Sequence, residues 1–317
     1  MKQPTEAPLL RAQTSFAVNL LNEVIKNNPE ATACSPFSAS VSLAMVYAGA
    51  RGETKKEIKD LIVGKSEVTE TQVHSYFSEL LRSVFNKTNS KERTFCLESA
   101  NKLFIREGFE LKEAYEQTIA EYYAGMLEQT DFKNKAALCK EVNGWVKETT
   151  HGLIKKILSK EDINKDTPMI ILNALYFKAK WGGRRLKDIK SLLDGFDGKA
   201  TLDLIKKTEK SQYSVEATVT VKIPKFEVNR AFQVANAEFE GISDQNPFFI
   251  DKATQSVCIK MNEKGTEAAA ATKVAPMTGS SGVLKKSIDV EFIADHPFFL
   301  LYRSQFHDSI LFAGAYT

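Results

Sequence analysis

The sequence predicts a mixed α+β fold, built as one domain that spans residues 1–317. In the N-terminal third, apolar residues recur at the spacing of amphipathic helices, as in Phe16, Leu20 and Val24. Further along, helical and strand patterns alternate, and residues 169–177 (MIILNALYF) form a nearly continuous apolar run of strand length. No Pro-rich or Gly/Ser-rich linker is long enough to separate two domains.

Each segment has its own pattern. The central run at 169–177 is apolar at almost every position, so we expect a strand that is buried on both faces. Helices are predicted at residues 16–25, 77–84, 115–122 and 143–158, and a charged helical stretch is predicted at 186–210. Strands are predicted at residues 101–105, 125–132, 169–177, 215–228, 256–262, 286–293, 298–302 and 310–313.

Composition excludes several classes of function. The 43 Lys and Arg residues are nearly balanced by 40 Asp and Glu, and the charges are mixed along the chain, so no nucleic-acid surface is expected. The four cysteines show neither CxxC pairs nor metal-ligand spacing to histidine, and we expect no metal and no cofactor. The start lacks a conventional signal peptide and no apolar run reaches transmembrane length. We therefore expect a cytoplasmic protein without a membrane partner, or alternatively export by a non-classical route.

A set of motifs spread over nearly the whole chain carries a resemblance to a known family. In chain order they are SPFSAS from Ser35, GARGET from Gly49, NGWV from Asn143, LNALYFK from Leu172, IPKF from Ile223, FEGIS from Phe239, NEKGTEAAAAT from Asn262 and HPF from His296. Together these motifs resemble those of the serpins, which are serine protease inhibitors. A chance match to all of them in the family order is very improbable.

The resemblance implies a serpin fold, in which helices pack around three sheets and a reactive-centre loop is exposed. It implies that a protease, of the serine or alternatively the cysteine class, attacks this loop as a substrate. The loop then inserts into the main sheet and traps the acyl-enzyme, so this chain needs no catalytic residue and acts as a monomer. The implied sheet-opening region comprises Ser35, Pro36, Ser38, Asn173 and Lys178.

The loop itself is indicated by composition. Residues 264–282 are rich in Ala, Gly, Ser and Thr and contain Pro276, which is typical of a long exposed loop. In an extended strand its first part would place only small side chains on one face, as a strand sliding between two packed strands requires. That face comprises Thr266, Ala268, Ala270 and Thr272. An Ala-rich helical turn or a flexible linker is the alternative. The predicted hinge comprises Gly265, Thr266, Glu267, Ala268, Ala269, Ala270, Ala271 and Thr272.

The bond that the protease cleaves is placed by the family's spacing from the hinge glycine. Carried onto Gly265, this spacing predicts the bond between Gly279 and Ser280. Glycine offers no side chain to a specificity pocket, so other positions stay open. These alternatives are Met277, Leu284, Lys285 and Lys286.

Two other functions are considered. A hydrolase could use His307, Asp308 and Ser309, but adjacency alone does not give a nucleophile, base and orienting group the required geometry, and no GxSxG or HExxH motif accompanies them. The other is a serpin fold that binds or stores without inhibiting, or an inactive shortened isoform.

The chain departs from the serpin pattern by an internal deletion. After Trp181 the family has a long series of antiparallel strands, whereas here Gly182 and Gly183 lead directly into the charged helical stretch. Missing strands leave edges unpaired and core faces uncovered. We therefore expect a shortened second and third sheet and weaker inhibition.

Overall fold

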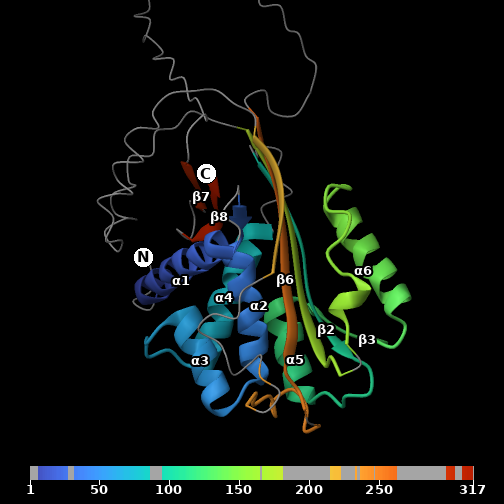
Figure 1. Cartoon of the computed structure of the whole chain (residues 1–317). Coiled ribbons are helices and arrows are strands. Elements are labelled where there is room, and N and C mark those ends of the chain that lie inside the picture. Colours follow the sequence, from blue (N-terminus) through green and yellow to red (C-terminus); the bar gives the residue numbers. More distant parts are fainter. Residues whose placement is uncertain are drawn as a thin grey trace, which may run out of the picture.

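The computed structural model describes residues 6–27, 32–85, 95–164, 166–180, 215–222, 233, 236–245, 247–262, 298–303 and 309–316. Figure 1 shows the larger of the two described sheets nearly edge-on, with helices on both sides of it. Most of the described helices pack on one side of this sheet, and a single long helix, α6 (Lys135–Thr149), covers the other.

Five helices of the N-terminal half form the thicker layer. α2 is apolar almost throughout and buried at every position, since it lies between the sheet and the helices α1, α3 and α5. The others present one apolar face and one polar face, as the helical spacing predicts. The five are α1 (Glu6–Asn27), α2 (Pro36–Gly49), α3 (Gly52–Val63), α4 (Glu70–Phe85) and α5 (Glu113–Tyr123).

The large sheet contains five described strands in the order β3-β2-β4-β6-β5. Pairing is antiparallel between β2 and β4 and between β6 and β5, but parallel between β2 and β3 and between the central strands β4 and β6. The strands are β2 (Phe95–Arg106), β3 (Leu127–Thr130), β4 (Met169–Lys180), β5 (Val215–Lys222) and β6 (Ile250–Asn262).

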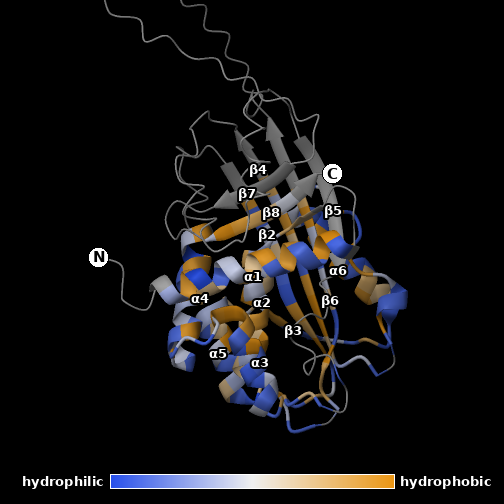
Figure 2. Ribbon diagram, turned by 60° about the vertical axis from the view of Figure 1, so that its left-hand side comes forward, coloured by the Kyte–Doolittle hydropathy of each residue, from blue (hydrophilic) through white to orange (hydrophobic). Residues whose placement is uncertain are grey.

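A smaller sheet packs above the start of α2. Its described strands follow the order β1-β8-β7, all antiparallel, and join the segment before α2 to the end of the chain. Figure 2 shows β8 as mostly hydrophobic, and its described side chains are buried. The strands are β1 (Thr32–Cys34), β7 (Phe298–Arg303) and β8 (Ile310–Tyr316).

Two of the sequence motifs meet in one tight contact. A Cβ at Gly49 would lie 2.0 Å from Cγ1 of Ile242, so the turn before α3 can approach this loop only without a side chain there. Glu238 completes the contact, because its carboxylate accepts from the backbone N–H of Thr54 at 3.1 Å in the first turn of α3. The contact joins the GARGET and FEGIS segments.

The fold class is confirmed, and the strand at 169–177 is buried on both faces as predicted. One helix was placed wrongly: the prediction of 143–158 becomes α6 at Lys135–Thr149. α6 ends there because Thr150 caps it and Asn143 turns its side chain to the following segment, accepting from the N–H groups of Ile157 and Leu158. The expected segments at 186–210 and 286–293 lie outside the described residues.

Candidate functional site: the seam between β4 and β6

The two central strands of the large sheet meet in a parallel pair. The register runs from Met169 opposite Ile250 to Lys180 opposite Asn262, with one irregularity after Met169. Parallel pairs have slanted hydrogen bonds and are slightly less stable per residue than antiparallel pairs. β6 ends at Asn262, directly before the predicted hinge. A strand that turned back from this end into the seam would run antiparallel to both neighbours.

A polar row crosses the seam in an otherwise apolar sheet. In the pairing registers, Asn101 of β2 lies opposite Asn173 of β4, which lies opposite Gln255 of β6. All three side chains are buried. Buried amides need hydrogen-bond partners, and these come from the first turns of α2.

The start of α2 is built to supply these partners. Ser35 is the N-cap, with its side chain accepting from the N–H of Ser38, and Pro36 occupies the first turn, where its missing N–H is tolerated. Ser38 and Ser42 are four residues apart and therefore face the same way. The hydroxyl groups of both lie within hydrogen-bond distance of Asn173 Oδ1, at 3.0 and 2.9 Å.

Ser38 is shared between two strands. Its Oγ lies 2.9 Å from Asn101 Oδ1 as well as 3.0 Å from Asn173 Oδ1, but a hydroxyl group has only one proton to donate. Both Nδ2 atoms lack a hydrogen-bond partner among the described residues. With one of the two amides flipped, its NH2 group donates to Ser38 Oγ and the Ser38 hydroxyl donates to the other amide oxygen, which satisfies the contact.

Gln255 connects β6 to the same turn of α2 through hydrogen bonds to the backbone of Ser35. Its Oε1 accepts from the backbone N–H of Ser35 at 2.6 Å, and its Nε2 donates to the backbone carbonyl of Ser35 at 3.0 Å. The hydroxyl of Ser35 donates to the carbonyl of Leu311 in β8 at 2.7 Å. β4 and β6 are thus each attached to the start of α2, independently of the ladder between them.

The opposite face of the seam is covered by α6. Odd-numbered residues of β4 face α2, whereas even-numbered residues such as Leu172 and Tyr176 pack in the cluster under α6. Cys258 is the buried member of this cluster from β6. Lys102 of β2 lies 4.8 Å from the ring centre of Trp145, which adds a cation–π contact between α6 and the sheet.

The structure brings together four of the five residues predicted for sheet opening: Ser35, Pro36, Ser38 and Asn173. Lys178 lies in β4, opposite Cys96 and Lys260, at the end where β6 leads toward the hinge. The predicted hinge (265–272) and all candidate cleavage positions lie outside the described residues.

Sequence reasoning missed two members of the row, Asn101 and Gln255, and also Ser42 of α2, which contacts Asn173. Local pattern gave little signal for the two amides, because Asn101 precedes Lys102 and Gln255 lies between Thr254 and Ser256, so neither interrupts an apolar run. Ser42 lies at helical spacing from Ser38.

The described residues offer little for the hydrolase alternative. Ser309 is only 3% exposed, and burial raises the pKa of the Cys34 thiol to about 12, which keeps it protonated. His307 and Asp308 lie outside the described residues. In the part of the chain that the structure describes, no His, Cys, Asp and Glu side chains gather in a group of three that could hold a metal ion. Nor does any helix there have the length and hydropathy to cross a membrane.

Comparisons with known proteins show the family to which this chain belongs. The family model described as "Serpin (serine protease inhibitor)" matches residues 11–184 and 197–317. Human plasminogen activator inhibitor 2 is 26% identical, with 96% of this chain and 98% of the relative aligned. A serpin-like protein of Thermococcus kodakarensis is 29% identical, over 99% of this chain and 86% of the relative.

The fold also matches solved structures, and the alignments reveal a shortening. Serpin48 of the insect Tenebrio molitor superposes with a TM-score of 0.72 at 24% identity, covering 99% of each chain. The alignment with human plasminogen activator inhibitor 2 extends over 412 positions, although this chain has 317 residues. The relative therefore contains many residues without a counterpart here, and the family match is interrupted between 184 and 197, shortly after Trp181.

Proposed function

This chain belongs to the serpin family, and we propose that it inhibits a serine protease as a suicide substrate. One observation supports the proposal: the parallel seam between β4 and β6, with the predicted hinge of mostly small residues following β6 in the sequence. The family is one of protease inhibitors rather than hydrolases, and the proposed chemistry belongs to the target. The same mechanism would serve a cysteine protease.

The first step takes place on the reactive loop. The nucleophilic oxygen of the protease attacks the carbonyl carbon of the bait residue, the peptide bond to the next residue breaks, and the new amino group leaves with a proton from the protease histidine. An acyl-enzyme remains on the hinge side of the loop. This chain supplies only the bait residue and the loop segments on either side of it.

The second step is insertion of the freed hinge into the seam. One parallel ladder is replaced by two antiparallel ladders, which are more stable per residue. The twelve residues of β4 extend over about 40 Å at about 3.3 Å each, so the trapped protease would be carried the length of the sheet. Small side chains on one face of the hinge, at Thr266, Ala268 and Ala270, allow this without overpacking the layer against α2.

The proposed bait bond is that between Gly279 and Ser280. From Gly265 to Gly279 the loop spans roughly 50 Å as a strand, whereas cleavage after Lys286 would leave slack that lets the protease escape. We expect productive trapping after cleavage within 277–281 and substrate turnover after cleavage at 284–286. Mass spectrometry of the peptide released from a trapped complex identifies the bond, and a released peptide that begins at Lys285, Lys286 or Ser287 would contradict the assignment.

A panel of serine and cysteine proteases tests the function. At least one serine protease should give a complex that survives SDS, at one bound protease for each protein monomer. Cleavage of the loop without any complex, for every protease, would instead support the non-inhibitory or inactive alternative, which the shortening seen in the alignments favours. Turnover of an ester or peptide by the chain alone would support the hydrolase.

A further inference from the structure

A histidine just beyond α6 contacts the sheet close to the seam. His151 Nε2 donates to Glu98 Oε2 of β2 at 2.8 Å. Its ring also meets the ring of Tyr176 of β4 edge-on, with 5.1 Å between the centroids. One side chain beyond the last turn of α6 thus touches two neighbouring strands, at a site where the histidine side chain is 58% exposed.

The backbone of His151 is held in an uncommon conformation. Its φ is +52°, in the left-handed region that favours glycine, and it follows the helix cap Thr150. The N–H of His151 donates to the carbonyl of Glu148 at 3.1 Å, and that of Gly152 donates to Lys147 at 2.7 Å. This is the usual glycine position of a helix end, but it carries a histidine, with Gly152 one residue later. Position 151 therefore carries a side chain, although glycine would fit this backbone conformation better.

The contact lies next to the line along which the seam opens. Glu98 lies opposite Tyr176 in the pairing of β2 with β4, and Tyr176 lies opposite Cys258 in the pairing of β4 with β6. An inserting strand would separate Tyr176 from Cys258. The layer that covers both is the cluster under α6, and His151 fastens this layer to the β2 and β4 side.

We propose that His151 is a positioning residue that clasps the end of α6 to Glu98 and Tyr176 and thereby sets the rate of loop insertion. The proposal rests on the proposed function. Side chains of the new strand that face α6 need room between Tyr176 and Cys258, so the end of α6 has to lift before the strand can pass. Because the contact with Glu98 is largely exposed, its loss changes the insertion rate by about twofold to fivefold, not by orders of magnitude.

Replacement by glycine distinguishes the effect of the side chain from that of the backbone conformation. His151→Gly removes the ring but suits the left-handed conformation, so helix capping is kept or improved. If the contact of His151 with Glu98 and Tyr176 (the clasp) slows insertion, His151→Gly should insert the loop faster, with an unchanged or raised denaturation midpoint. If His151 serves only as a helix cap, the variant should show the raised denaturation midpoint without any change in the insertion rate. Asn134→Ala is the matched control, because it removes the cap at the other end of α6, where Asn134 Oδ1 accepts from the N–H of Ala137.

Insertion can be followed without a target protease. The probe is a synthetic peptide with the sequence of residues 265–279, added to the full chain carrying Trp181→Phe, so that Trp145 of α6 is the only tryptophan. Uptake of the peptide into the seam displaces α6 and changes the fluorescence of Trp145. We expect uptake to be about twofold to fivefold faster in His151→Gly and in Glu98→Ala, and unchanged in Asn134→Ala.

The double variant shows whether the two residues act through each other. If the clasp is the pair, His151→Gly combined with Glu98→Ala takes up the peptide no faster than either single variant. Additive effects, or wild-type rates in both single variants, would overturn the clasp while leaving the proposed function intact. If the wild-type protein takes up no peptide and gains no stability after loop cleavage, the proposed function itself fails.

Discussion

β4 has two long neighbours in the sheet, and they differ. On one side it pairs with β2 in an antiparallel ladder from Phe95 opposite Ala179 to Ile105 opposite Met169. On the other it pairs with β6 in a parallel ladder of similar length. Of the two ladders, the parallel one has the weaker hydrogen-bond geometry. Under the proposed mechanism, the sheet would open between β4 and β6.

The side chains compensate for this difference. On the antiparallel side Asn101 contacts α2 through one hydroxyl group, that of Ser38. On the parallel side Gln255 holds both backbone groups of Ser35, at 2.6 and 3.0 Å. The weaker ladder is therefore the one with the firmer attachment to α2. Under the proposed mechanism, this attachment would hold the seam closed until the inserting strand replaces the ladder.

The largest effect is expected from a change that stops the seam from accepting a strand. Ala268→Arg places a long charged side chain on the small face of the hinge, where overpacking alone costs about 1–3 kcal/mol and desolvation adds to it. Since about 1.4 kcal/mol is a factor of ten in the partition, the SDS-stable complex should fall about tenfold or more, with loop cleavage retained. Gel densitometry of complex and cleaved chain measures this.

The matched control carries the same substitution one residue later. Ala269→Arg points to the opposite face of the strand, where Glu267 already places a charge. It should lose much less of the complex. Equal losses in both variants would show that the hinge does not enter the seam as an alternating strand.

A second prediction contrasts the two sides of β4 directly. Gln255→Ala leaves the N–H and carbonyl of Ser35 without their buried partner, so the free energy of unfolding should fall by about 2–4 kcal/mol. Asn101→Ala should cost about 1–2 kcal/mol. Urea denaturation measures both values. Uptake of the 265–279 peptide should accelerate only in Gln255→Ala, and equal acceleration in both would mean that the sheet does not open selectively at the seam.

The sequence was sufficient for the parts that depend on local pattern. The run at 169–177, which is apolar at almost every position except Asn173, was predicted as a strand buried on both faces, and the structure confirms this. The start of β6 was less clear, because residues 250–255 mix charged and polar side chains with apolar ones. The prediction therefore began at Ser256 and excluded Gln255.

The polar row itself could not be predicted from local pattern. Asn101, Asn173 and Gln255 come from three strands that are far apart in the chain, and only the pairing register aligns them. α6 shows the same limit, because tertiary contacts of Asn143 with Ile157 and Leu158 replace the helix that the apolar spacing predicted there. Long-range register and side-chain-to-backbone bonds decided both cases.

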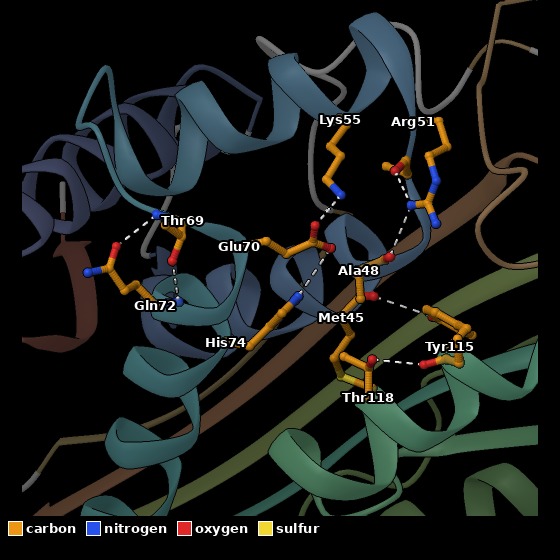
Figure 3. A network of polar contacts seen from close by, with 12 residues as sticks. Met45, Ala48, Arg51, Lys55, Thr69, Glu70, Gln72, His74, Tyr115 and Thr118 are labelled. Carbon is orange, nitrogen blue, oxygen red and sulfur yellow. Dashed lines mark hydrogen bonds and ion pairs between the residues drawn. The ribbon is translucent and has the colours of Figure 1, made fainter.

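A third prediction concerns a histidine remote from the seam. His74 of α4 is buried, with Nδ1 2.7 Å from the hydroxyl of Tyr123 and Nε2 3.7 Å from Glu70. Figure 3 shows His74 and Lys55 both directed toward Glu70, and Lys55 pairs with it at 2.6 Å. Desolvation lowers the pKa of His74 below its usual 6.5, although Glu70 partly opposes this. Rings of Tyr47 and Tyr122 complete the surroundings.

The sign of the pH effect follows from this direction. Between the lowered pKa of folded His74 and the unfolded value near 6.5, the unfolded chain binds more protons. Stability is therefore complete above pH 6.5 and is lost as the pH falls from there through the folded pKa, by about 1.4 kcal/mol for each pH unit that separates the two pKa values. Urea denaturation between about pH 5 and 8 should show this slope, and His74→Gln should flatten it. An unchanged slope in the variant would assign the effect to other groups.

The smallest effect is expected at the start of α4, far from both neighbours of β4. Thr69 and Gln72 form a reciprocal cap, in which Thr69 Oγ1 accepts from the N–H of Gln72 at 3.2 Å and Gln72 Oε1 accepts from the N–H of Thr69 at 2.8 Å (Figure 3). Thr69→Ala should lower the free energy of unfolding by about 1 kcal/mol, because it frees an exposed helix end. Peptide uptake at the seam should keep the wild-type rate, since α4 contributes nothing to the attachment of β4 or β6 at Ser35. Urea denaturation and the Trp145 assay measure the two quantities in the same preparation. If uptake accelerates here as it does in Gln255→Ala, opening follows global stability, and the difference between the two ladders of β4 does not control it.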